Sequence, residues 1–313
     1  MKRLVIIFSL VLISVQMGAQ RWGVVSFSSV FLRSAPDYEA PLETQALMGG
    51  IVEITGSQGY WSSVILHNPS YKAWVTDLGV IEMDPEEFDN YLAAPKYICT
   101  AMRSRVLSRP SAGSPCISDL LAGDILRKDV SPKGRAVSSG RYVSVKLPDG
   151  RFGWTLARDV ADLEDWAAAS SLTSENIVST AHKFLGIPYM WGGNTANYVD
   201  CSGLVWMVYM LNGIILPRNA SQQARLGKEI APGDAAPGDL MFFGTPASDG
   251  SPERISHVAI YIGDGRVIHA SQIVRTGSIR ASDDDYIGRQ PLRTRRITAS
   301  DEGVVRILGD GRF

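Results

Sequence analysis

Short apolar runs separated by turn residues fill the chain from about Trp22 to Ile81, without the spacing of apolar positions that marks a helix. The expected strands of this stretch lie at 24–32, 51–55, 61–66 and 73–75. A second stretch, from about Lys96 to Val160, repeats the plan with expected strands at 103–107, 125–128, 142–145 and 152–156. The two stretches therefore look like copies of one small β module.

The pattern changes to mixed helix and strand after Asp162. Thr173 or Ser174 can cap a helix whose apolar positions recur at helical spacing as far as Leu185, and Gly186 is expected to end it. A second helix is expected to begin near Cys201, with one apolar face made of Leu204, Val205, Val208 and Tyr209. Three β-rich runs follow at 239–244, 257–263 and 266–271, and the Gly-Asp-Gly at 263–265 predicts a hairpin turn.

A chain of 313 residues is longer than one hydrophobic core usually serves, so several compact units are expected. The predicted fold class is multidomain: two small β-barrels followed by an α+β domain. We place the first barrel at 20–83, a helical or extended linker at 84–95, the second barrel at 96–162 and the α+β domain at 163–313.

The amino-terminal residues 1–19 have the pattern of a secretory signal peptide. Lys2 and Arg3 precede an apolar run from Leu4 to Val15, and small residues follow it. The run is short for a membrane span, so cleavage is expected, with retention as an anchor as the alternative. The protein is therefore expected to be exported, either to a periplasm or into the medium.

The overall charge excludes few functions beyond nucleic-acid binding. The chain has 31 basic and 32 acidic side chains and a net charge of -1, so a nucleic-acid surface is not indicated. A weakly charged surface is also a poor electrostatic trap for anionic glycans, which would need shaped pockets instead.

The three cysteines, Cys99, Cys116 and Cys201, leave one thiol unpaired in an exported protein. Cys99 and Cys116 could form a disulfide or could both be free thiols. Cys201 stands where a loop gives way to a helix, and the helix amino terminus is expected to stabilise a thiolate. The alternative is a small apolar residue buried at a helix start.

Two histidines are candidates to act with this thiol. His257 is expected at the start of one strand of the hairpin and His269 near the end of the next, so that the hairpin brings them together. His257 could accept the thiol proton, and His269 could hold its imidazole in the right tautomer. Zinc bound by the cysteine, the histidines and Asp200 is the rival interpretation, although close ligand pairs such as CxxC are absent from the sequence.

Longer motifs from Thr173 to Phe313 resemble the NlpC/P60 family of papain-like cysteine peptidases. They are "FLGIPYMWGGNTANYVDCSGLVWMVY", "LPRNASQQA", "APGDLMFFG" and "SHVAIYIGDGRVIHAS". The resemblance implies that Cys201 is the nucleophile, His257 the general base and His269 the orienting residue. It also implies no metal and no organic cofactor.

The two β modules resemble bacterial SH3 domains, with an unrelated pair of small barrels as the alternative. The matching segments are "VFLRSAP" and "RVLSRPS" at 30–36 and 105–111, and "AWVTDLGV" and "GWTLARDV" at 73–80 and 153–160. In that family, such barrels help to hold or position the substrate of wall hydrolases.

The order of domains is similar to that of the γ-D-glutamyl-L-diamino acid endopeptidases, which cut wall peptides carrying a free L-alanine amine. This resemblance implies that Tyr189 lies beside the nucleophile, where it could bind substrate, or it could simply pack under the loop. It also implies substrate subsites for the γ-D-Glu and L-Ala residues, lined by Asp200, Ser202, Asn219 and Ser221.

From the first barrel, Tyr71 is the main candidate contact and Glu43 a weaker one, with ordinary barrel surface as the alternative for both. Asn219 departs from the aspartate that the family often has there, which weakens the expected ion pair to a substrate amine unless another acid compensates. The expected activity is hydrolysis of the γ-D-Glu to diamino acid bond. The alternatives are a non-catalytic wall-binding protein and a papain-like amidase or acyltransferase.

Overall fold

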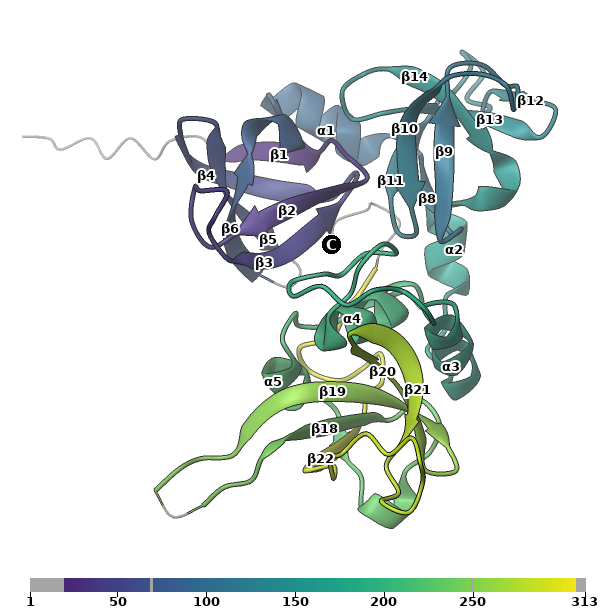
Figure 1. The fold of residues 1–313 in the computed structure, drawn as a ribbon. Coiled ribbons are helices and arrows are strands. Elements are labelled where there is room, and N and C mark those ends of the chain that lie inside the picture. The colour runs from purple at the N-terminus through teal and green to yellow at the C-terminus, as the bar shows by residue number, and fades with distance from the viewer. Residues whose placement is uncertain (1–19, 68–69, 249, 308–313) are drawn as a thin grey trace, which may run out of the picture.

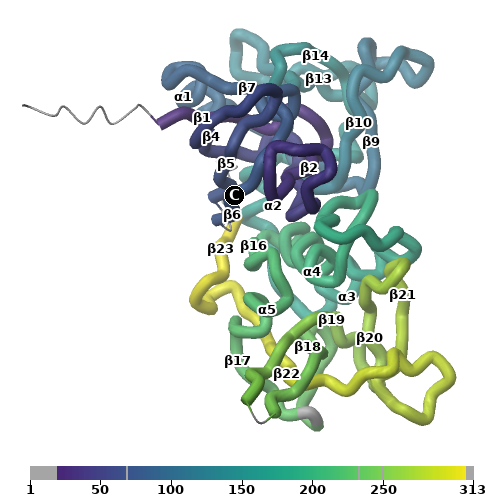
Figure 2. Tube along the Cα trace, turned by 60° about the vertical axis from the view of Figure 1, so that its left-hand side comes forward, coloured from purple at the N-terminus to yellow at the C-terminus, as the bar shows by residue number. Residues whose placement is uncertain are grey.

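The computed structural model describes residues 20–67, 70–248 and 250–307, so the expected signal peptide lies outside the described residues. Figure 1 shows two β-rich units side by side and a mixed domain, coloured green to yellow, beneath them. Figure 2 shows the same stacking after a turn of the molecule. None of the helices in the described part of the chain is long and apolar enough to cross a membrane.

The first barrel is one antiparallel sheet of seven strands in the order β3-β2-β6-β5-β4-β1-β7. Its apolar core includes Val25, Leu32 and Val64. The expected strand at 24–32 is two strands, because a bend at 26–28 separates them. The bounds are β1 Arg21–Val25, β2 Ser29–Arg33, β3 Leu42–Leu47, β4 Ile51–Gln58, β5 Trp61–His67, β6 Ser70–Thr76, the 3-10 turn η1 Asp77–Gly79 and β7 Val80–Met83.

The second barrel repeats this topology, with the order β10-β9-β14-β13-β11-β8-β15 and the short β12 added to β13. Equivalent turns carry equivalent hydrogen bonds: the Ser34 N–H donates to the Pro41 carbonyl at 3.0 Å, and the Ser108 N–H to the Pro115 carbonyl at 2.9 Å. The two modules are therefore copies of one fold. The bounds are β8 Lys96–Cys99, β9 Arg103–Leu107, β10 Cys116–Leu121, β11 Ile125–Lys128, β12 Ser138–Ser139, β13 Tyr142–Lys146, β14 Phe152–Leu156, η2 Ala157–Asp159 and β15 Val160–Asp162.

Between the barrels lies helix α1, Pro85–Ala93. Asp84 caps it by accepting a hydrogen bond from the Glu87 backbone N–H at 2.9 Å, and the Glu87 carboxylate accepts one from the Asp84 N–H at 3.4 Å. Phe88 and Tyr91 bury the inner face of the helix against the first barrel. The acidic segment between the barrels is thus an ordered, packed helix.

The carboxy-terminal domain, described from residue 163 to residue 307, packs helices against a six-stranded antiparallel sheet of order β17-β22-β18-β19-β20-β21. The β19–β20 hairpin turns at Asp264–Gly265, as the sequence predicts. His257 lies inside β19 and not at its start, because Arg254 and Ile255 before it also pair with β18. The bounds are α2 Leu163–Ala169, α3 Ser174–His182, α4 Cys201–Met210, β16 Ile214–Ile215, α5 Ala220–Gln223, β17 Lys228–Glu229, η3 Pro232–Asp234, β18 Leu240–Thr245, β19 Arg254–Gly263, β20 Arg266–Ser271, β21 Ile273–Ser278, β22 Arg293–Arg296 and β23 Val305–Arg306.

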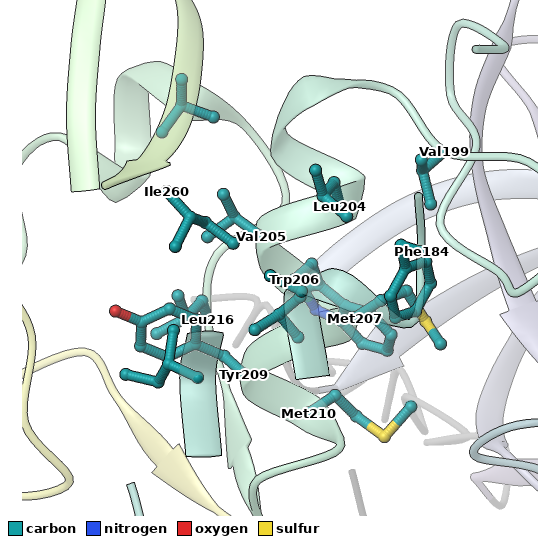
Figure 3. Packing of buried hydrophobic residues seen from close by; sticks show 14 of the residues in the cluster. Phe184, Val199, Leu204, Val205, Trp206, Met207, Tyr209, Met210, Leu216 and Ile260 are labelled. Carbon is teal, nitrogen blue, oxygen red and sulfur yellow. The ribbon is translucent and has the colours of Figure 1, made fainter. Parts of the chain in front are cut away.

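Helix α4 is the centre of the main apolar core, and every residue from Ser202 to Met210 is buried. Figure 3 shows apolar side chains around the helix, among them Phe184, Leu216 and Ile260. The face predicted to be apolar is buried, and the opposite face of the helix is buried as well. The helix has the sheet on one side and the two barrels on the other, so water reaches neither side.

The three parts of the chain meet in this core. Leu47 of the first barrel, Leu121 of the second and Met210 of α4 belong to one buried cluster. Gly123 has a φ of +94°, which side chains with a Cβ rarely adopt, and a Cβ there would lie 2.3 Å from Met210 and 2.8 Å from Leu47, so glycine suits this contact. The buried Asp124 carboxylate accepts the Met48 N–H at 3.0 Å, which joins the two barrels directly.

Candidate active site

The nucleophile candidate, Cys201, is the first residue of α4. Asp200 caps the helix by accepting a hydrogen bond from the Gly203 N–H at 2.7 Å. Gly203 itself lies against the preceding loop, since a Cβ there would be 1.9 Å from the Gly193 oxygen. The Cys201 N–H is one of the amides at a helix start that lack a partner within the helix, so it can bind a developing oxyanion.

The thiol of Cys201 lies against the strand that carries His257. The sulfur accepts hydrogen bonds from the backbone N–H groups of Val258 and Ser202. Pairing of β19 with β20 begins only at Ile260, which leaves the Val258 edge of β19 open towards the helix start. The sulfur and the residue next to His257 are therefore in direct contact.

The two histidines hydrogen-bond to each other: His257 Nε2 lies 3.0 Å from His269 Nδ1, and both rings are buried. This contact leaves Nδ1 as the ring nitrogen with which His257 can accept a proton from the thiol. His257 must then donate through Nε2, so that His269 accepts at Nδ1 and carries its own proton on Nε2. Among the described residues, His269 Nε2 is buried without a partner.

Burial keeps the thiol and both imidazoles in their neutral forms. It raises the pKa of Cys201 to about 11, with the Asp200 charge as the second cause. It lowers the pKa of His257 to about 3, helped by the charges of His269 and Arg289. The pKa of His269 falls to about 4, again mainly through burial. Desolvation of the thiol thus opposes the stabilisation of a thiolate that is expected from the helix amino terminus.

Acid should therefore destabilise the protein through its histidines. The contribution of the two neutral histidines to the free energy of unfolding is complete above about pH 6.5, the usual histidine pKa. It is lost as the pH falls towards the lowered pKa values of His257 and His269 in the folded protein. Each histidine contributes about 1.4 kcal/mol of lost stability per pH unit in this window. We expect the melting temperature of the protein to fall by several degrees between about pH 7 and pH 5, and the fall to be smaller for His269→Gln.

Comparing how steeply the melting temperature falls with pH in the wild type and in His269→Gln isolates the effect of the His269 imidazole. Burial raises the pKa of the Asp124 carboxyl, an effect of opposite sign, but it is the same in both proteins. Equal pH slopes for the wild type and His269→Gln would contradict the role given to burial of this ring.

An open cleft of about 1010 Å³ runs over Cys201. It is lined by all the sequence-predicted binding residues, which come from both the first barrel and the carboxy-terminal domain: Glu43, Tyr71, Tyr189, Asp200, Ser202, Asn219 and Ser221. Sequence analysis missed its remaining lining residues: Trp191, Ala220, Arg254, Ile255 and Ser256. Trp191 is 71% exposed, and the signal available in the sequence was a tryptophan directly before the Gly192–Gly193 turn.

One wall of the cleft is a polar cluster centred on Tyr71. Its hydroxyl donates to Glu43 Oε2 at 2.5 Å, and Asn219 is a further hydrogen-bond partner of the same hydroxyl. Burial and the Glu43 carboxylate raise the pKa of Tyr71 to about 12. The carboxylate of Glu43 thus stands beside Asn219, where the family often has an aspartate.

Tyr189 lies on the nucleophile side of the cleft. Burial raises its pKa to about 12, and the next causes are the charges of Cys201 and Asp200, which places the hydroxyl near both. It therefore remains a neutral hydrogen-bond donor near the sulfur.

Arg218 was not singled out from the sequence, yet it organises the site. Its guanidinium donates to both oxygens of Asp200, at 3.0 and 2.6 Å, and to Ser202 Oγ at 3.0 Å. It also donates to Thr44 Oγ1 of the first barrel at 2.9 Å. All of these groups are buried. A signal was present, because Asp200 and Arg218 are the only charged residues between 184 and 224.

Asp200 and Ser202, expected at substrate subsites, are largely engaged by the protein itself. The Asp200 carboxylate caps α4, pairs with Arg218 and accepts the Gly192 N–H at 2.9 Å. Ser202 Oγ donates to Asp200 at 3.1 Å. Their first role is to hold the start of α4 in place.

An amide pair joins the first barrel to the loop before α4. The Gln45 N–H donates to Asn194 Oδ1 at 2.8 Å, and Asn194 Nδ2 donates to the Gln45 carbonyl at 3.2 Å. Glu43 lies two residues from Gln45 on the same strand, so this contact fixes the Glu43 carboxylate relative to Cys201.

The other cysteines are free: Cys99 is buried and Cys116 is exposed. Burial raises the pKa of the Cys99 thiol to about 12. In the described residues, no group of three His, Cys, Asp or Glu side chains is arranged to hold a metal ion.

Comparison with known proteins agrees with this arrangement. A model described as the NlpC/P60 family matches residues 186–296, and one described as the bacterial dipeptidyl-peptidase Sh3 domain matches residues 32–77. A γ-D-glutamyl-L-lysine dipeptidyl-peptidase of Bacillus cereus is 28% identical over 248 residues, which cover 76% of this chain and 70% of that protein. Its namesake in Bacillus subtilis is 28% identical over 262 residues, covering 82% and 81%.

The fold also matches a solved structure. The crystal structure of an NlpC/P60 family protein from Bacillus cereus superposes with a TM-score of 0.72 at 24% identity, covering 88% of this chain and 99% of that one.

A third sequence relative, dipeptidyl-peptidase 6 of Lysinibacillus sphaericus, is 31% identical over 192 residues, or 60% of this chain and 66% of that protein. Taken with the motifs and the geometry around Cys201, these matches show that the chain contains an NlpC/P60 domain preceded by an SH3-like region.

Proposed function

We propose that the protein is an exported cysteine peptidase that hydrolyses the γ-D-glutamyl to L-diamino acid bond of bacterial cell-wall peptides and requires a free amino-terminal L-alanine. The dipeptidyl-peptidase names of its relatives support cleavage of such peptides. The observation that carries the proposal is the position of Glu43 and Tyr71, which bring a carboxylate from the first barrel into the cleft of Cys201.

In the proposed reaction, His257 accepts the thiol proton as Cys201 attacks the γ-carbonyl carbon of D-glutamate. The carbonyl oxygen becomes an oxyanion beside the Cys201 N–H. Collapse of this intermediate breaks the C–N bond, and His257 returns the proton to the departing diamino acid amine. Water then attacks the thioester, with His257 as base, and releases L-Ala-γ-D-Glu.

Recognition of the free amine is assigned to Glu43. An ammonium group beside this carboxylate makes a charge-assisted hydrogen bond, which the neutral Asn219 cannot supply alone. Ser221 lines the same cleft and offers a hydroxyl for the backbone of the dipeptide.

The test is a digest of L-Ala-γ-D-Glu-L-Lys and L-Ala-γ-D-Glu-meso-diaminopimelate, each with a free and with an acetylated amino terminus. We expect release of L-Ala-γ-D-Glu, detected by mass spectrometry, from the free peptides and roughly 100-fold lower kcat/KM for the acetylated ones. Glu43→Gln should raise KM for the free peptide by about tenfold. The difference in kcat/KM between the free and the acetylated peptides should therefore become smaller.

Glu39→Gln is the matched control, because Glu39 is an exposed acid of the same barrel that does not line the cleft. Equal cleavage of free and acetylated peptides would rule out the amine requirement. No cleavage of any of the four would rule out the peptidase itself.

A further inference from the structure

Charge is distributed unevenly between the two barrels. Residues 96–162 contain twelve lysine and arginine residues against six aspartates and no glutamate, whereas residues 20–83 contain three basic and six acidic residues. The net charge of the whole chain, -1, hides this difference. The sequence-based conclusion that the surface is weakly charged is therefore wrong for the second barrel.

Three arginines of the second barrel line one open pocket of about 750 Å³, open solvent included. Arg105 comes from β9, Arg141 precedes β13, and Arg158 lies in η2. All three are exposed. The pocket brings together three turns and strands that are far apart in the sequence, so the clustering is a product of the fold.

Nearby acids neutralise this pocket only in part. Asp159 accepts a hydrogen bond from Ser104 Oγ at 2.6 Å and lies 3.6 Å from Arg158 Nε. Asp119 stands opposite Arg105 across the strands, and no ion pair between these two side chains is formed in the described structure. Arg141 lies over the Tyr142 ring, 5.5 Å from its centroid, and forms no ion pair within the described residues.

The same three positions in the first barrel are apolar. The Asp77 N–H donates to the Tyr60 carbonyl as the Ala157 N–H donates to the Arg141 carbonyl, which makes Tyr60 equivalent to Arg141. By the same turns and strand registers, Leu78 corresponds to Arg158 and Phe31 to Arg105.

All three apolar residues are exposed, at 47% for Phe31, 76% for Tyr60 and 73% for Leu78. One fold thus presents the same surface twice, once with large apolar side chains and once with arginines. Packing of the barrel does not demand arginine at these positions, since the other copy folds without it.

We propose that the pocket of Arg105, Arg141 and Arg158 binds oxyanion groups of a linear anionic polymer. Guanidinium groups are weakly hydrated and bind carboxylate or phosphate oxygens in pairs, so three of them around one concavity suit a single oxyanion with its neighbours along a chain. The six excess positive charges of the barrel add an attraction that salt screens. This site is separate from the cleft of Cys201 and does not depend on its chemistry.

Two probes distinguish the possible sources of the oxyanion: a γ-linked D-glutamate decamer for carboxylates and a polyphosphate of similar length for phosphates. Binding of each to the full chain is measured by isothermal titration calorimetry at about 50 mM and about 300 mM salt. The pocket variant is Arg105→Gln with Arg141→Gln and Arg158→Gln. The control variant, Arg109→Gln with Lys133→Gln and Arg135→Gln, removes the same charge from exposed positions outside the pocket.

We expect the wild type to bind at least one probe, the pocket variant to lose at least about tenfold in affinity, and the control variant to lose less than about threefold. Equal losses in the two variants would overturn the proposal in favour of a diffuse basic field. No binding of either probe at low salt would also overturn it, as would tighter binding of a DNA duplex than of both probes. An unchanged melting temperature shows that each variant folds. The outcome of this binding experiment does not affect the proposed peptidase activity, which is tested by the peptide digest.

Discussion

Replacing Cys201 with alanine should abolish release of L-Ala-γ-D-Glu from the free peptides, with kcat/KM lowered by at least about 10⁴-fold. Alanine retains the Cβ but removes the only atom that can form the thioester. Because the substitution removes a single neutral sulfur atom and leaves no unpaired charge behind, the melting temperature should fall by no more than a few degrees. Release of the dipeptide, followed by mass spectrometry, is the measurement.

Cys116→Ala is the matched control, because this thiol is free and exposed in the second barrel. It should leave kcat/KM within about twofold of the wild type. Substantial turnover by Cys201→Ala would show that another group does the chemistry. Loss of activity in both variants would instead indicate a thiol requirement unrelated to the cleft.

Replacing Arg218 with methionine should lower the free energy of unfolding by about 3–5 kcal/mol, because it leaves the Asp200 carboxylate buried without its partner. The same change removes the bonds to Ser202 and Thr44 and should lower kcat, since the start of α4 is no longer fixed. Urea unfolding and single-turnover kinetics measure the two effects.

Neutralising both Asp200 and Arg218 separates the effect of the unpaired charge on stability from the effect of lost packing. Asp200→Asn combined with Arg218→Met should recover part of the lost stability, since no unpaired charge then remains in the interior. An exposed ion pair serves as the control: Arg266→Met breaks the pair with Asp285 and should lower the stability far less than Arg218→Met does. A double variant as unstable as Arg218→Met alone would show that the ion pair is not the cause.

Local patterns in the sequence were sufficient to predict the two β modules, the start of α4 and the hairpin of the histidines. Each depends on residues close together in the chain: the short apolar runs between turns, as in β5, the cap at Thr173, or the turn at Gly263–Gly265. The binding residues came from resemblance, and the structure brings them into one cleft with Cys201. Their individual roles stay predictions.

Contacts between distant parts of the chain could not be predicted in this way. Strand β3 was missed because Thr44 and Gln45 are polar yet buried against the carboxy-terminal domain, so the strand lacks an alternating pattern. The raised pKa of Cys201 likewise depends on how deeply neighbouring elements cover the thiol. Burial of α4 on all sides depends on the barrels that pack over it.

The junction of Leu47, Gly123 and Met210 has a consequence for how the cleft keeps its shape. Domains joined only by a flexible linker would move relative to one another and would change the distance between Glu43 and the Cys201 sulfur. Here the two barrels and the carboxy-terminal domain instead share one buried apolar core. The barrel wall of the cleft is therefore held beside Cys201 by the same buried contacts that hold α4.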